Sequence, residues 1–259
     1  MSPDSEPEKL AEGTLISHLL ELRDRLLRAL VAVGIAFIPC MFYMHEIFSF
    51  VAQPLLEKLP QGGSLIATGV MSPFTTPFKL AVFTAIFLAI PFVIYQLWAF
   101  VAPGLYRNER RFAVPLLISA IVLFYVGMAF AYYFVFPVMF RFFASINPSG
   151  VAMMTDINNY LDFVLTMFFC FGLAFEVPVA VVLLVIMGLV RLESLVKNRG
   201  YVLIGIFILA ALLTPPDVIA QCSLALPMYL LYEGGILMAR ILVRRRAQDA
   251  DARASGAMK

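Results

Sequence analysis

The chain has 259 residues, of which 62% are hydrophobic and 14% charged, and its formal net charge is only +2. A soluble domain is usually about 45–50% apolar and about 25% charged, so a soluble fold of this length could not bury so much apolar surface. Composition therefore excludes an ordinary soluble protein and indicates one embedded in a membrane, with no separate soluble domain.

The first 25 residues precede the first long apolar stretch. A secretory signal would need a basic start followed closely by an apolar run, and this segment is acidic instead, so we expect it to be retained. Within it, Glu21 and Arg25 are four residues apart, as are Asp24 and Arg28. Leucines at helical spacing around them predict an amphipathic helix. Its opposite charges can pair, each pair contributing about 0.3–0.5 kcal/mol.

Six apolar stretches follow, at about 26–44, 78–101, 112–143, 160–189, 201–213 and 218–239. A helix needs about 20 residues to cross a bilayer. The first four stretches satisfy this, whereas the fifth would rise only about 20 Å and the sixth has polar residues near both ends. Two short neighbouring spans should thin the bilayer or be covered by partner helices.

Prolines interrupt several of these stretches, namely Pro91, Pro137, Pro178 and Pro227. Each lacks a backbone donor and should kink its helix. We therefore predict an all-α, polytopic membrane protein of six transmembrane helices, whose kinks and short C-terminal spans form a concave bundle. The domains would be a cytoplasmic segment over 1–25, the transmembrane domain over 26–242, and a disordered cytoplasmic tail over 243–259.

The basic residues are distributed unevenly among the loops. Of 19 Lys and Arg residues, only Lys58, Lys79 and Arg141 fall on one side of the predicted topology. Basic loops resist translocation, so the side with the other sixteen should be cytoplasmic, with both termini inside. On the outer side, residues 45–77 combine prolines and glycines with many apolar residues, which favours an ordered cap over a linker.

Cysteine and histidine are too sparse for metal or redox chemistry. Cys40, Cys170 and Cys222 lie in apolar stretches without metal-ligand spacing, and a free Cys of this kind behaves as a small hydrophobe. His18 and His45 stand alone on opposite sides of the predicted membrane. We expect no metal, no cofactor and no histidine-based catalysis.

Four separated motifs resemble the TatC family, the core subunits of the twin-arginine protein translocase. They are residues 18–25, residues 95–111, Phe175-Glu176-Val177-Pro178 and residues 212–217, read as Leu-Leu-Thr-Pro-Pro-Asp. The resemblance extends from about residue 15 to residue 242. It implies a bacterial inner-membrane receptor that binds signal peptides with consecutive arginines and supports export of folded proteins driven by the proton gradient.

The resemblance also implies which residues bind. Glu21 and Glu109 would hold the two arginines, because a guanidinium pairs in a fork with a carboxylate. Glu176, Asp217 and Gln221 would contact the single-span partners TatA and TatB, within a complex that contains several copies of the chain. The full signal-peptide set would be Glu21, Arg23, Phe100, Leu105, Tyr106 and Glu109.

Some alternatives stay open. Glu176 lies near the middle of the fourth span, where a carboxylate is costly and usually functional, but it could also be protonated and join two helices of this chain. Pro215-Pro216-Asp217 could simply be a tight turn.

The competing function is a proton-coupled transporter of small solutes. An intramembrane hydrolase is less favoured, because Asp156, Asp162 and Asp217 all fall at the outer edge. The sequence contains no phosphate-binding Gly-Lys-Ser/Thr motif, and we expect no nucleic-acid partner.

Overall fold

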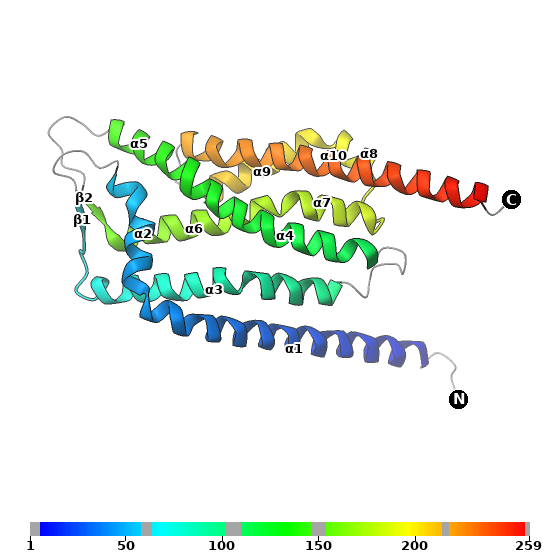
Figure 1. Cartoon of the computed structure of the whole chain (residues 1–259), viewed down its shortest axis with the longest axis horizontal. Helices are drawn as coiled ribbons and strands as arrows, with labels where there is room; N and C mark the ends of the chain where they lie inside the picture. Colours follow the sequence, from blue (N-terminus) through cyan, green and yellow to red (C-terminus); the bar gives the residue numbers. More distant parts are fainter. Residues whose placement is uncertain (1–5, 58–63, 102–109, 147–153, 214–217, 257–259) are drawn as a thin grey trace.

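A computed structural model describes residues 6–57, 64–101, 110–146, 154–213 and 218–256. Its helices lie side by side along the long axis of the molecule, and a pair of short strands closes one end (Figure 1). The elements are α1 (Glu6–Phe42), α2 (Met44–Leu56), β1 (Ser64–Ile66), α3 (Ser72–Val101), α4 (Arg110–Phe130), the π-helical turn η3 (Ala131–Val135), α5 (Phe136–Ile146), β2 (Met154–Asp156), α6 (Ile157–Phe175), α7 (Val177–Ile186), α8 (Leu192–Lys197), α9 (Arg199–Leu213) and α10 (Val218–Gly256).

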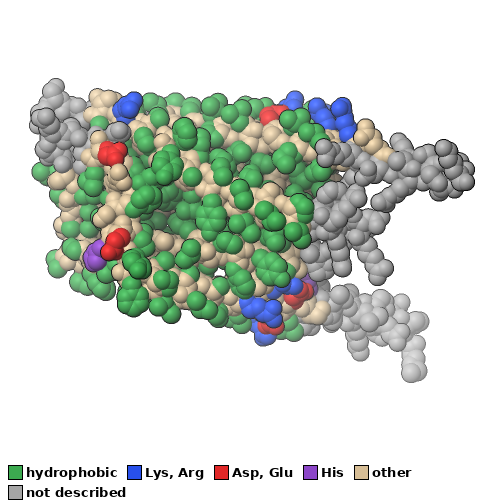
Figure 2. Space-filling view, in the orientation of Figure 1, with side chains coloured by type: hydrophobic (Ala, Val, Ile, Leu, Met, Phe, Trp, Pro, Cys, Tyr) green, Lys and Arg blue, Asp and Glu red, His purple; other side chains and the backbone are tan. Residues whose placement is uncertain are grey.

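The described residues contain five stretches that are long and apolar enough to cross a membrane. They are Ser17–Phe42, Ser72–Phe100, Val114–Ser145, Ile157–Ile186 and Gln221–Arg244. The remaining apolar helix, α9, has only 15 residues, which agrees with the shortness that the sequence predicts for the fifth stretch. The sixth stretch is predicted to be short as well, and this prediction is wrong, because Gln221–Arg244 has 24 residues and is long enough to cross. Hydrophobic side chains cover the middle of the molecule, and charged ones gather toward its two ends (Figure 2). The protein is therefore a helical, multi-pass membrane protein.

Aromatic side chains form the main core, where α2, α3, α4, α5 and α6 meet. Phe124, Phe136 and Phe171 are fully buried there. Helices α4 and α6 approach closely because Gly127 in α4 leaves room for the backbone of Phe171 in α6. Small residues at such crossings are typical of membrane helices, where tight packing drives association.

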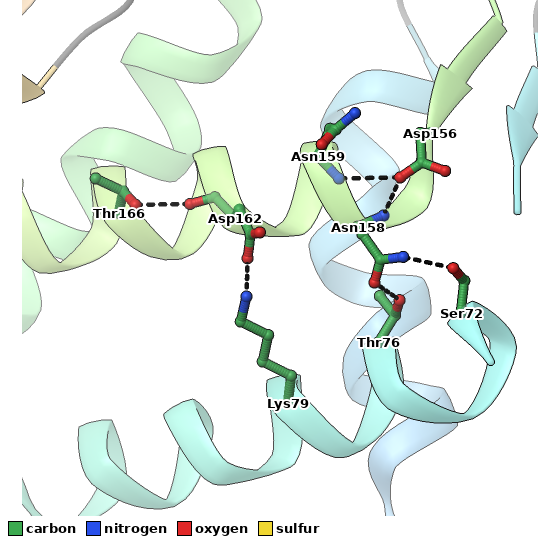
Figure 3. A network of polar contacts seen from close by, with 8 residues as sticks. All are labelled: Ser72, Thr76, Lys79, Asp156, Asn158, Asn159, Asp162 and Thr166. Carbon is green, nitrogen blue, oxygen red and sulfur yellow. Dashed lines mark hydrogen bonds and ion pairs between the residues drawn. The ribbon is translucent and has the colours of Figure 1, made fainter. Parts of the chain in front are cut away.

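The end of the bundle that carries the strands is held by polar contacts between the starts of α3 and α6 (Figure 3). Asn158 binds the hydroxyl groups of Ser72 and Thr76, and Lys79 forms an ion pair with Asp162. Strands β1 and β2 pair in parallel beside this network, with Ile66 opposite Asp156. The sequence predicts neither the strands nor this network. It does predict order in residues 45–77, and α2 and β1 lie in this segment.

Asp156 links the strand pair to α6. One carboxylate oxygen accepts hydrogen bonds from the hydroxyl and backbone N–H of Thr68, at 2.5 and 3.1 Å. The other caps α6 by accepting from the backbone N–H groups of Asn158 and Asn159. Bonds from Thr68 and from the first turn of α6 stabilise the ionised form, and they lower the pKa of Asp156 to about 2.

Two predictions differ from the structure, one about the C-terminal segment and one about a cysteine. Helix α10 continues to Gly256, into the segment 243–259 for which the sequence predicts a disordered tail, because its Arg, Ala and Gln residues are good helix formers. Cys40 and Cys170 are buried as expected, but Cys222 is exposed. Within the described ranges, no three His, Cys, Asp or Glu side chains are grouped as a metal site requires.

Candidate functional site

Glu21 lies on α1, near the end of the bundle opposite the strands. Its side chain is 37% exposed, and Arg25 from the next helical turn binds it through Nε at 3.0 Å and Nη2 at 2.5 Å. Both bonds go to the same oxygen, Oε1. The other oxygen, Oε2, lies 4.0 Å from Nδ1 of His18. The predicted pair between Glu21 and Arg25 is therefore confirmed, and it leaves one carboxylate oxygen accessible to a further donor.

Residues of α3 complete this corner of the molecule. Arg25 also donates to the side-chain oxygen of Gln96 at 3.5 Å, and Gln96 is buried. The ring of His18 stacks on the ring of Phe100, with 4.2 Å between the ring centroids and 20° between the planes. The structure thus brings Phe100, one of the predicted site residues, to the same helix crossing as Glu21.

An apolar groove lies beside this polar cluster, between α1 and α3. We call it the α1–α3 groove, and its cavity measures about 110 Å³. It is lined by Leu22, Arg25, Leu26, Ala29, Val93, Gln96, Leu97 and Phe100. Because Arg25 and Gln96 belong to both features, the groove adjoins the ion pair of Glu21 and Arg25, so that a charged end and an apolar end meet there.

The remaining predicted signal-peptide residues have different outcomes. Arg23 is exposed and donates twice to the neighbouring Asp24, at 3.0 and 2.8 Å, so Asp24 is bound by Arg23 and not by the Arg28 that its spacing suggests. Leu105, Tyr106 and Glu109 lie outside the described residues.

Glu176 marks a break in the fourth span. It ends α6 and precedes α7, which begins with Val177 and Pro178. Its Oε1 atom is buried and has no hydrogen-bond partner among the described residues. A buried polar atom left without a partner costs about 1–3 kcal/mol, so this oxygen is suited to accept a donor from another chain or to carry a proton.

The other two predicted partner-contact residues lie in the segment between α9 and α10 and at the start of α10. The side-chain amide of Gln221 donates to the backbone oxygen of Phe207 at 3.0 Å, which ties α10 to α9. Asp217 lies outside the described residues.

Sequence reasoning missed two polar features near the end of the bundle that carries Glu21. Gln96 is one, and its signal was a single amide inside an otherwise apolar run. The other is an ion pair between α9 and α10, in which Arg199 Nη2 donates to Glu233 Oε2 at 2.7 Å and Nε lies 2.7 Å from Oε1. The hydroxyl of Tyr229 also donates to Glu233, at 3.2 Å. A lone acid within the last apolar stretch was the available signal for this contact.

Comparison with known proteins gives consistent matches. Residues 17–227 match the family described as "Sec-independent protein translocase protein (TatC)". The TatC proteins of Azotobacter chroococcum mcd 1 and Escherichia coli K12 are 52% and 51% identical to this chain, over 95% and 88% of it and 97% and 89% of their own lengths. A crystal structure described as the twin-arginine translocase receptor TatC superimposes with a TM-score of 0.78 at 31% identity, covering 86% of this chain and 99% of that one.

Proposed function

The chain belongs to the TatC family of protein translocase subunits, and from this premise we propose that it is the signal-peptide receptor and assembly platform of a twin-arginine translocase. In this role it recognises precursors by a signal peptide with consecutive arginines. The observation that carries the proposal is the surface formed by Glu21 and the α1–α3 groove.

The chemistry of this surface suits an arginine followed by apolar residues. Oε2 of Glu21 can accept a guanidinium N–H while Oε1 stays bound to Arg25. A charge-assisted bond of this kind is about twice as strong as a neutral one. Glu109, the only acid of its loop, would supply the second acceptor, with Arg23, Leu105 and Tyr106 around the bound peptide.

The groove explains how a peptide could bind although basic residues predominate on this side. Salt screens charges beyond about 8–10 Å, so the local carboxylate decides more than the average field. Burial of apolar side chains of the peptide in the groove would add about 25 cal/mol for each Å² removed from water. Phe100 and Leu97 would form its walls.

The proposed topology follows the distribution of basic residues. The start of α1 and the end of α10 lie at the same end of the bundle (Figure 1). With α9 as a short sixth crossing, this arrangement suits a chain with both termini in the cytoplasm of a bacterium. Residues 1–25 and 243–259 would lie outside the membrane, and residues 26–242 would form the part within the inner membrane. Transport would draw its energy from the proton gradient.

Glu176 is proposed as the contact for TatA or TatB. Its buried Oε1 lacks a donor among the described residues, and a polar side chain on a single-span partner could provide one. Gln221 and Asp217 would extend the contact along α10 toward the outer end, and several copies of the chain would assemble in one complex.

The hydrolase alternative loses two of its three candidate acids, and the third, Asp217, lies outside the described residues. Asp156 caps α6 and binds Thr68, and Asp162 pairs with Lys79, so both have structural partners and neither forms a pair of aspartates. We therefore propose a transport component that has no catalytic site of its own.

The test is binding of a twin-arginine peptide to the purified chain in nanodiscs, compared with a twin-lysine version of the same peptide. Glu21→Gln keeps the size of the side chain and removes its charge. We expect it to weaken twin-arginine binding about fivefold to tenfold, the range of one charge-assisted bond at a partly exposed site, and to affect twin-lysine binding less.

Glu193→Gln is the matched control, because Glu193 is an exposed acid on α8 that lies outside the groove. Equal binding of both peptides to the parent and to the Glu21 variant would refute the proposed receptor site. Flux of a small solute through vesicles that contain this chain alone would favour the transporter alternative.

A further inference from the structure

A second cavity lies between α2 and the segment η3–α5, well away from Glu21 and nearer the end of the bundle that carries the strands. We call it the α2–α5 pocket, and its volume is about 240 Å³. This is below the roughly 300–1,000 Å³ of sites for drug-sized ligands, so the pocket suits a small group. The side chains used below are Phe50, Gln53, Glu57, Tyr132, Tyr133 and Pro137, which all line it.

The wall contributed by the continuous stretch of α4, η3 and α5 is irregular. Residues 131–135 form a π-helical turn, and Pro137 follows two residues after its end. Pro137 has no N–H, so the carbonyl of Tyr133, four residues earlier, receives no α-helical bond from it. Such π turns occur often at functional sites, because one extra residue in the turn redirects the side chains. Here the turn places two consecutive tyrosines in the pocket wall.

Aromatic rings dominate this wall and are held firmly. Phe50 and Tyr132 stack with 4.7 Å between their centroids and 9° between their planes. The hydroxyl of Tyr132 donates to the backbone oxygen of Phe50 at 2.8 Å. Tyr133 stands edge-on to Tyr132, with centroids 5.0 Å apart. Phe50 and Tyr133 remain 54% and 65% exposed, so their rings are accessible to a ligand.

One carboxylate completes the pocket. Glu57 accepts a hydrogen bond at Oε1 from the amide of Gln53, one helical turn earlier, at 2.8 Å. No Lys or Arg belongs to the described lining. A carboxylate beside exposed aromatic rings is the combination that binds ammonium groups, because both the charge and the ring faces attract a cation.

We propose that the α2–α5 pocket binds the ammonium group of a zwitterionic phospholipid. A lipid is favoured as the source because three lining residues, Tyr132, Tyr133 and Pro137, belong to a stretch long and apolar enough to span a membrane, Val114–Ser145. Phe134 and Val138, which flank the lining residues on this stretch, are 64% and 55% exposed and offer an apolar path for an acyl chain.

The lipid phosphate also has a candidate partner. Arg141 follows Pro137 by one helical turn on α5, on the same face, and it is exposed. Glu57 and Arg141 would thus match the two charges of a zwitterionic headgroup. A headgroup without an ammonium group would bring no positive charge to Glu57.

Native mass spectrometry of the full chain, loaded from an equimolar mixture of phosphatidylethanolamine and phosphatidylglycerol with identical acyl chains, tests this proposal. We expect the parent to retain the amine lipid about fivefold more than the glycerol lipid, the combined range of an exposed cation–π contact and an exposed ion pair. Glu57→Gln should bring the ratio close to one. Glu46→Gln, an exposed acid on the same helix outside the lining, should leave the ratio unchanged.

A second lipid probe separates charge from shape. N-acetyl phosphatidylethanolamine has no ammonium charge, and the parent should retain it no better than phosphatidylglycerol. Equal retention of all three lipids by the parent, or an unchanged ratio in the Glu57 variant, would overturn the proposal. Displacement of both main lipids by a lysine-rich peptide, without discrimination between headgroups, would also overturn it in favour of a protein partner.

Discussion

Replacement of Gly127 by Ala tests the packing of the bundle. A Cβ atom at this position would lie 2.4 Å from the backbone oxygen of Phe171 and 3.0 Å from Cβ of Phe175. Ordinary contact begins near 3.4 Å, so α6 would have to move by about 1 Å. Because the obstacle is backbone, the cost should reach the upper end of overpacking, about 3 kcal/mol, and the better helix propensity of Ala returns about 1 kcal/mol of it.

The net loss of about 2 kcal/mol should lower the melting temperature by about 4–8 °C. A fluorogenic thiol dye can report this melting, because Cys40 and Cys170 are buried, and the exposed Cys222 can be replaced by Ala in every sample. Gly34→Ala is the matched control, since a Cβ atom there meets nothing within 4 Å. That variant should melt at or above the parent temperature, and Gly127→Ala melting as high as Gly34→Ala would refute the packing argument.

Three further predictions concern polar contacts. The pKa of Asp156 is lowered to about 2 in the folded protein, so its contribution to stability is present above the unfolded value near 4 and disappears as the pH falls toward 2. In thermal melts, Asp156→Asn should therefore lose less stability than the parent between pH 4 and pH 2. The same loss in both proteins would contradict this role. Tyr160→Phe removes a buried hydrogen bond of 2.8 Å to the backbone oxygen of Val51 and should cost about 1 kcal/mol in denaturant unfolding; no loss would show that this tie between α6 and α2 contributes nothing. Glu233→Gln breaks the ion pair with Arg199 and should speed hydrogen exchange at the start of α9, and identical exchange would contradict the proposed tie between α9 and α10.

The long helices could be predicted because their signal is local. Apolar runs of sufficient length identify four of the spans from sequence alone, and the shortness of α9 follows from the same count. The pair between Glu21 and Arg25 was predictable for the same reason, since helical spacing places residues four apart on one face.

Contacts between distant segments could not be predicted in this way. Strands β1 and β2 have three residues each, too few for a periodic pattern, and their pairing joins segments that are distant in the chain. The stack of His18 on Phe100 likewise depends on the crossing of α1 and α3, which no local pattern specifies. A helix that continues beyond its apolar part, as α10 does, carries no hydropathy signal in its last turns.

The most direct test of the central claim is photocrosslinking of a twin-arginine signal peptide to single positions of this chain in native membranes. Leu97 lines the α1–α3 groove and is 59% exposed, and Ile118 on α4 is similarly exposed, at 57%, outside the groove. We predict crosslinks from position 97 that disappear when the peptide carries two lysines, and none from position 118. Crosslinks of equal yield from both positions, or crosslinks that do not depend on the arginines, would contradict the proposed binding surface.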